Sequence, residues 1–395
     1  MSAKSPVEHP LSKSDAQILT NRGYIIENIV GEGSYAKVYQ CKKVDNGKTH
    51  WLACKVIDAA KAPANFAKKF LAREIDILTK ISHPHIIHLY SMLHKGNKFF
   101  IFMRLAEKGD LLEYILKKNQ VGEGRARSWT AQLALALEYL HEMGIVHRDI
   151  KTENILITAS FNAKLSDFGF ARNIYQNGVE NLCQTHCGSM PYTAPEVLRG
   201  RKYDARKSDM WSLGVVTYVM LNRRLPFTGS TNQEAMIQRQ LEKRVSFDTK
   251  EAHTSHYRSA VMSLLEPDVG KRLSASQLLS SPWIMQDDRL ILRTKQEKEA
   301  LAKARIIKEK SMVQHKPVEE EENIVALHRS LMEQAATAAM QMRAGQNAAG
   351  VSVLRPEAIS SYTSIRRDVD HLEDATSGVR VVRKPQQISS SRMKK

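Results

Sequence analysis

Two short stretches of this 395-residue sequence gather side chains that could move a phosphoryl group. In His147-Arg148-Asp149-Ile150-Lys151-Thr152-Glu153-Asn154, Asp149 can orient an attacking hydroxyl and Lys151 can steady the transferred group. Asn154 and the Asp167 of Ser166-Asp167-Phe168-Gly169 supply hard oxygen ligands of the kind that Mg²⁺ prefers. The pattern therefore indicates phosphoryl transfer from a nucleotide to a hydroxyl, and Ala194-Pro195-Glu196 follows at a spacing that fits.

A glycine-rich run, Gly31-Glu32-Gly33-Ser34-Tyr35-Ala36-Lys37-Val38, precedes these stretches. Glycine lets the backbone approach phosphate oxygens where a side chain would clash, so the run predicts a phosphate-binding loop. A plain hairpin turn is the alternative.

Lys55 lies inside the apolar run Ala53-Cys54-Lys55-Val56-Ile57. A lysine in such a strand requires a partner, and Glu74 on the following predicted helix is the candidate. The pair would aim the ammonium group at the nucleotide phosphates. A surface lysine on an edge strand, with Glu74 exposed on its helix, is the alternative.

The elements that must position these residues change from strands to helices along the chain. Apolar patterning predicts strands at 24–30, 36–44, 51–57 and 98–103, and helices at 67–81, 129–143 and 210–221. The order predicts an α+β fold with a small β-rich lobe and a larger helical lobe, joined near residues 104–108.

These motifs, in this order, resemble the protein kinase superfamily over about Tyr24 to Met285. Within it, the sequence is similar to the calcium/calmodulin-kinase-like group and, most closely, to the testis-specific serine/threonine kinases. The narrower resemblance rests on the glycine-rich run with its Ala36, on 61–66 leading to 73–78, on 108–113, and on Cys187-Gly188-Ser189.

The resemblance implies roles for single residues. For ATP it implies Gly31, Glu32, Gly33, Ser34, Tyr35, Ala36, Lys37, Val38, Ala53, Lys55, Met103, Asp110 and Leu156, with hinge residues 104–106; Arg104 departs from the usual glutamate. It implies catalytic roles for Asp149, Lys151, Asn154, Lys55 and Glu74, and magnesium ligation by Asn154 and Asp167. It also implies an apolar spine of Leu78, His147 and Phe168, an anchor of Asp209 and Trp211, and an ion pair of Glu196 with Arg272.

Lys151 and Ser189 resemble the Ser/Thr class, in which this serine hydroxyl bridges Asp149 and Lys151. Glu153 resembles the acidic residue that reads arginine upstream of the acceptor, so a preference for basic residues is expected. Arg148 indicates control by phosphorylation, with Thr185 as the expected acceptor for an upstream activating kinase. An unmodified loop threonine is the alternative.

Outside the expected catalytic domain, 24–285, the sequence predicts an N-terminal extension at 1–23, a charged helical segment at 286–343 and a disordered basic tail at 344–395. An amphipathic helix over Ile324–Met342 could dock on the catalytic lobe, on another protein or on calmodulin, or pack with nothing in particular.

The formal charge of +17 invites a nucleic-acid interpretation, but no zinc-finger spacing or aromatic-basic stripe accompanies it. No run of about 18 apolar residues exists, so no membrane-spanning helix is expected. Four cysteines are too few for a disulfide framework and fit a reducing, intracellular setting. A metal site at Cys183, His186 and Cys187 has no second ligand cluster to complete it.

These features predict a monomeric cytoplasmic enzyme, with the nucleus as an alternative, acting on protein substrates and needing ATP and Mg²⁺. A pseudokinase would lack Lys55, Asp149 or Asp167, and none is missing. A scaffold acting through its tail is the remaining alternative. A role in germ cells is implied by the resemblance alone.

Overall fold

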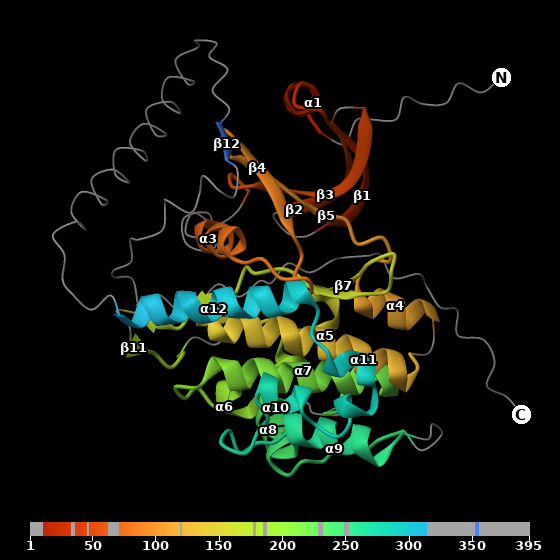
Figure 1. The fold of residues 1–395 in the computed structure, drawn as a ribbon, viewed down its shortest axis with the longest axis vertical. Helices are drawn as coiled ribbons and strands as arrows, with labels where there is room; N and C mark the ends of the chain where they lie inside the picture. Colours follow the sequence, from red (N-terminus) through yellow and green to blue (C-terminus); the bar gives the residue numbers. More distant parts are fainter. Residues whose placement is uncertain are drawn as a thin grey trace, which may run out of the picture.

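The computed structural model describes residues 11–32, 36–45, 47–61, 71–118, 121–176, 179–184, 188–227, 232–248, 253–313 and 352–354. These residues form two lobes, a small one built on a β-sheet and a large one built mainly of helices (Figure 1). The predicted α+β fold is confirmed. Within the described residues, no helix has the length and apolarity needed to cross a membrane.

The small lobe is an antiparallel sheet with the strand order β1-β2-β3-β5-β4-β12. Its strands are β1 (Tyr24–Glu32), β2 (Ala36–Asp45), β3 (Lys48–Asp58), β4 (Leu89–Lys95), β5 (Lys98–Arg104) and β12 (Ser352–Leu354). Helix α3 (Ala72–Lys80) follows β3 in the chain. Because β3 lies between β2 and β5, both edges of its backbone are hydrogen-bonded, and its central residues are fixed in position.

A second helix of the small lobe, α1 (Lys13–Thr20), was not predicted from the sequence. Leu19 on this helix is 1% exposed and packs in an apolar cluster with Tyr24 and Phe102. Asp15 is buried and lies 2.8 Å from the ammonium of Lys95 and 2.6 Å from that of Lys98. The helix therefore closes the outer face of the sheet.

Two buried helices form the centre of the large lobe. Helix α5 (Glu123–Glu142) buries residues on all sides, as its all-round apolar pattern predicts, and α7 (Ala205–Asn222) packs against it. Helix α7 begins five residues before the predicted apolar stretch, where the Asp204 side chain caps it by accepting from Arg206 N at 2.9 Å.

The remaining helices surround this centre. They are α4 (Leu111–Lys118), α6 (Pro195–Leu198), α8 (Gln233–Leu241), α9 (Ser255–Leu264), α10 (Ala275–Leu279), α11 (Asp288–Ile291) and α12 (Lys295–Val313). The large lobe also contains three short strand pairs: β6 (Ile145–Val146) with β9 (Arg172–Asn173), β7 (Ile155–Ile157) with β8 (Ala163–Leu165), and β10 (Tyr175–Gln176) with β11 (Val179–Glu180). The turns beside these pairs hold the motif residues.

Candidate active site

A cleft of about 990 Å³ opens between the two lobes. The predicted nucleotide residues that line it are Gly31, Glu32, Val38, Ala53, Lys55, Met103, Asp110 and Leu156. Ala36 and Lys37 lie elsewhere: Ala36 is buried in the core, and the half-exposed Lys37 pairs with Glu32 at 2.9 Å. Gly33, Ser34 and Tyr35 lie outside the described residues.

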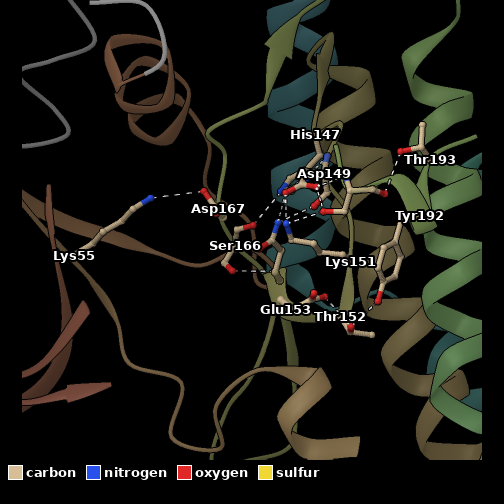
Figure 2. Close-up of polar contacts among 12 residues, drawn as sticks. Lys55, His147, Asp149, Lys151, Thr152, Glu153, Ser166, Asp167, Tyr192 and Thr193 are labelled. Atoms are coloured by element: carbon tan, nitrogen blue, oxygen red, sulfur yellow. Dashed lines mark hydrogen bonds and ion pairs between the residues drawn. The ribbon is translucent and has the colours of Figure 1, made fainter. Parts of the chain in front are cut away.

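The predicted pair of Lys55 and Glu74 forms at the inner end of this cleft. Lys55 Nζ lies 2.7 Å from Glu74 Oε1 and 3.6 Å from Asp167 Oδ1. Burial alone would lower the pKa of Lys55, but the two carboxylates outweigh it and raise that pKa. Strand β3 thus presents a permanently charged ammonium to the cleft, and Figure 2 shows it pointing across to Asp167.

Asp149 lies on the large-lobe side, within a network of polar contacts. Lys151 Nζ is 2.7 Å from its Oδ2, and the amide nitrogen of Asn154 donates to the same oxygen at 3.0 Å. Ser189 donates to Oδ1 through its backbone N–H at 3.1 Å and its hydroxyl at 3.2 Å. Lys151 also donates to the Ser189 hydroxyl at 3.0 Å, so this serine bridges Asp149 and Lys151 as predicted.

Asp209 fixes the backbone just before Asp149. Its side chain is fully buried and accepts from His147 N at 3.0 Å and from Arg148 N at 2.8 Å. Arg148 has a φ of 66°, a left-handed conformation that is unfavourable for a side chain of this size. The buried carboxylate on α7 therefore holds a strained turn in place.

Asp167 follows β8, and a contact with the loop that carries Asp149 holds it. It also has a positive φ, 60°, and the preceding Ser166 donates to Asn154 O through both its N–H and its hydroxyl, each at 2.9 Å. The ring of Phe168 contacts that of His147 at 4.9 Å, and Phe168 shares the large apolar core with Leu78. Although burial would raise the pKa of Asp167, Lys55, His147 and Lys151 together lower it.

Comparison with known proteins identifies the family to which the chain belongs. The protein kinase domain model matches residues 24–284. The chain belongs to the protein kinase family. It is 41% identical to human testis-specific serine/threonine-protein kinase 1, over 68% of this chain and 74% of that protein. It is 39% identical to mouse testis-specific serine/threonine-protein kinase 3, over 67% of this chain and 97% of that protein. The enzyme is an ATP-dependent serine/threonine protein kinase.

In this kinase, Glu196 and Arg272 form the predicted ion pair, with Arg272 nitrogens 2.5 and 2.9 Å from the two carboxylate oxygens. Arg272 is fully buried and also donates to the carbonyl oxygens of Glu266 and Lys207, each at 2.8 Å. Trp211 is buried beside it, 5.0 Å from the guanidinium. The pair therefore ties α6, which carries Glu196, to the segment between α9 and α10 that carries Arg272.

Sequence reasoning missed three contacts, two near Glu153 and one at Ser189. Thr152 donates to Glu153 Oε2 at 2.9 Å, and its hydroxyl lies 2.8 Å from that of Tyr192 (Figure 2). Thr193 donates to Ser189 O at 3.1 Å. A lone tyrosine or threonine carries no distinctive spacing, so no local pattern marks these residues.

Two predictions concern residues with no described placement. Thr185, together with His186 and Cys187 of the metal alternative, lies outside the described residues, and so does Ile324–Met342. Cys183 is described and is 2% exposed, and burial raises the pKa of its thiol. Among the described residues, no group of three His, Cys, Asp or Glu side chains could hold a metal ion.

Proposed function

We propose that this kinase transfers the γ-phosphoryl group of Mg·ATP to protein Ser and Thr hydroxyls, with Asp149, Lys151 and Asn154 on one side of the cleft and Lys55 and Asp167 on the other. One observation carries the proposal: each Asp149 carboxylate oxygen is fixed by two donors, while the loop that carries it faces the Lys55–Asp167 pair. A carboxylate held this way is preorganised before any substrate arrives.

Asp149 would accept a hydrogen bond from the substrate hydroxyl and orient its oxygen towards the γ-phosphorus. Lys151 and Ser189 keep the carboxylate from rotating, and Lys151 adds positive charge beside the oxygens that become more negative during transfer.

The oxygen atoms on the cleft wall suit a magnesium ion as ligands. Asp167 offers carboxylate oxygens, and the amide nitrogen of Asn154 is committed to Asp149, which leaves the amide oxygen for other contacts. Hard oxygen ligands of this kind are what Mg²⁺ requires. When bound, the ion would neutralise phosphate charge; Lys55, held by Glu74, would do the same from the small lobe.

The adenine would lie between the apolar side chains of Val38, Ala53 and Leu156, with Met103 behind it and the backbone of residues 104–106 beside it. Asp110 would approach the ribose, and its carboxylate also accepts from Glu113 N at 2.8 Å and so begins helix α4. A single residue would thus serve both the helix and the nucleotide.

Substrate choice follows from charge. Glu153 lines the open cleft, and its carboxylate is oriented by Thr152. We infer a preference for arginine or lysine upstream of the acceptor, because opposite charges favour binding at such a surface. A positional peptide library tests this: wild type should enrich basic residues, Glu153→Gln should lose that enrichment, and no enrichment in wild type would contradict the inference.

Regulation is proposed at Thr185, with a phosphate on it held by Arg148 and added by an upstream kinase. Thr185→Ala should lower activity strongly, and unchanged activity would reject the site. Monomeric state and a role in germ cells are further proposals. The second is motivated by the names of the testis-specific relatives.

The deciding experiment is transfer of labelled phosphate from Mg·ATP to a basic protein by the full chain. Wild type should transfer, and Asp149→Asn should lose at least about 100-fold in kcat while keeping its thermal midpoint within a few degrees. Omitting Mg²⁺ should abolish transfer. A wild type that stays inactive after treatment with an activating kinase would favour a pseudokinase.

A further inference from the structure

Helix α12 begins beyond residue 284, where the family match ends, yet it belongs to the main core. Ala300, Leu301 and Ala304 on this helix are 7%, 8% and 0% exposed. Figure 1 shows α12 lying along α5 and below α3. Helices α12 and α5 are in contact. The helix therefore covers the part of the large lobe that lies next to the small lobe.

The first turn of α12 places one carboxylate deep in this contact. Thr294 and Glu297 form a reciprocal cap: Glu297 N donates to Thr294 Oγ1 at 3.3 Å, and Thr294 N donates to Glu297 Oε2 at 2.7 Å. The other oxygen, Oε1, lies 2.8 Å from Nε2 of His85, and Glu297 is 6% exposed. Burial would raise the pKa of Glu297, but these hydrogen bonds lower it to about 2, so Glu297 is charged.

His85 relies on Glu297. Its ring is buried, and Nδ1 has no hydrogen-bond partner within the described part of the chain. The hydrogen is therefore assigned to Nε2, where it is donated to Glu297. Without this carboxylate the imidazole would hold a buried N–H without an acceptor. Because an unsatisfied buried donor costs free energy, the loop that carries His85 would shift.

That loop connects α3 to β4 and touches the strand that leads to Asp167. His85 O accepts from Leu165 N at 2.9 Å, and Leu165 O accepts from Ile87 N at 2.9 Å. Ser82, just after α3, donates its N–H to the Tyr139 hydroxyl at 2.9 Å. The loop thus joins the helix that carries Glu74 to the strand that ends two residues before Asp167.

We propose that Glu297 is a positioning residue for phosphoryl transfer: by holding His85, it fixes the α3–β4 loop and so keeps Glu74 and Asp167 in register with Lys55. The inference rests on the proposed role of the Lys55–Glu74 pair. On this proposal, helix α12, which lies outside the matched domain, controls the geometry of the cleft.

The competing explanation is that α12 only stabilises the large lobe, and the chain contains a matched control for it. Arg293, just before α12, pairs with the buried Glu138 of α5 at 2.6 Å. Lys308, further along the helix, pairs with Glu142 of α5 at 3.2 Å. Both contacts secure the same helix through α5, and neither ion-pair partner lies on the α3–β4 loop.

The test compares full-length Glu297→Ala with Arg293→Met, using kcat, KM for ATP and the thermal midpoint. A charge-assisted hydrogen bond commonly shifts an equilibrium about tenfold or more, so Glu297→Ala should lower kcat about 10-fold with KM within about twofold. Arg293→Met should lower the thermal midpoint by a similar amount and leave kcat within about twofold. Equal kcat in the two variants, measured well below both midpoints, would overturn the proposal.

Two further readouts separate this proposal from the proposed function. Amide hydrogen exchange should quicken in residues 74–88 of Glu297→Ala and stay at the wild-type rate in Arg293→Met, whether or not either protein is active. The double variant Glu297→Ala/His85→Ala should be no slower than the slower single variant, because both changes remove one contact. Additive losses, or unchanged exchange in residues 74–88, would overturn the coupling even if transfer itself is confirmed.

Discussion

Replacing Asp209 by asparagine should disable the kinase by releasing a strained turn. The carboxylate accepts three hydrogen bonds: Arg148 N to Oδ1 at 2.8 Å, and both His147 N and His141 Nε2 to Oδ2 at 3.0 Å. Asparagine has the same shape but only one acceptor oxygen. If that oxygen serves the two histidines, the amide NH₂ faces the N–H of Arg148, and the opposite flip sacrifices the histidine contacts.

The magnitude follows from these contacts. Losing a hydrogen bond to a charged acceptor costs about 1.5–3 kcal/mol, and changing the other two from a charged to a neutral acceptor costs roughly 1 kcal/mol in total or more. Together about 2.5–4 kcal/mol is lost, and the left-handed strain at Arg148 is no longer opposed. If releasing the turn moves the neighbouring Asp149 and raises the activation free energy of transfer by about 3 kcal/mol, kcat falls roughly 100-fold.

The assay is steady-state phosphorylation of a basic peptide, with thermal unfolding measured in parallel. Asp209→Asn should lower kcat about 100-fold, leave KM for ATP nearly unchanged, and lower the thermal midpoint by roughly 6–15 °C. Asp204→Asn is the matched control, because it makes the same change on the same helix at a cap where asparagine serves equally well. A kcat for Asp209→Asn within threefold of wild type would refute the reasoning.

Three other predictions follow from single contacts. Glu74→Gln removes the charge beside Lys55, so kcat should fall at least about 10-fold while the fold is kept, which paired activity and circular dichroism measurements would check. Leu19→Ala should cost about 2–4 kcal/mol in denaturant unfolding; a loss below 1 kcal/mol would mean that α1 is not docked in solution. Burial lowers the pKa of His83 from 6.5 to about 3, so only the unfolded chain takes up this proton as the pH falls below 6.5. Acidification from pH 7.5 to 5.5 should therefore reduce the free energy of unfolding by about 1.4 kcal/mol through this group, and His83→Gln should flatten the slope by that amount.

Local sequence patterns predicted the cleft better than its surroundings. Lys55 in an apolar strand demands a counterion, and Glu74 was the nearest acidic residue on the next predicted helix, so burial chemistry alone gave the pair. The bridge from Ser189 to Asp149 and Lys151 was predicted from family resemblance. In both cases a short motif fixes residue type and spacing at once.

Contacts between distant, unremarkable segments were not predictable. Residues 13–20 have mixed polarity, and the partners of Asp15 lie on β4 and β5, far along the chain. Glu297 likewise reads as one charge among many in a charged helix, and only the folded chain shows that it meets His85. Strand β1 runs two residues past its predicted end, to Glu32, and a difference of this size reflects the ordinary uncertainty of element boundaries.

The helices at the two ends of the described domain have a practical consequence for dissecting the protein. A fragment cut at the limits of the family match would lose Leu19 from one lobe and the buried alanines of α12 from the other. Each cut would expose an apolar surface that the intact chain covers, and such surfaces promote aggregation. The smallest soluble unit should therefore start before Lys13 and end after Ala304, and a shorter fragment that precipitates would say nothing about the chemistry of the cleft.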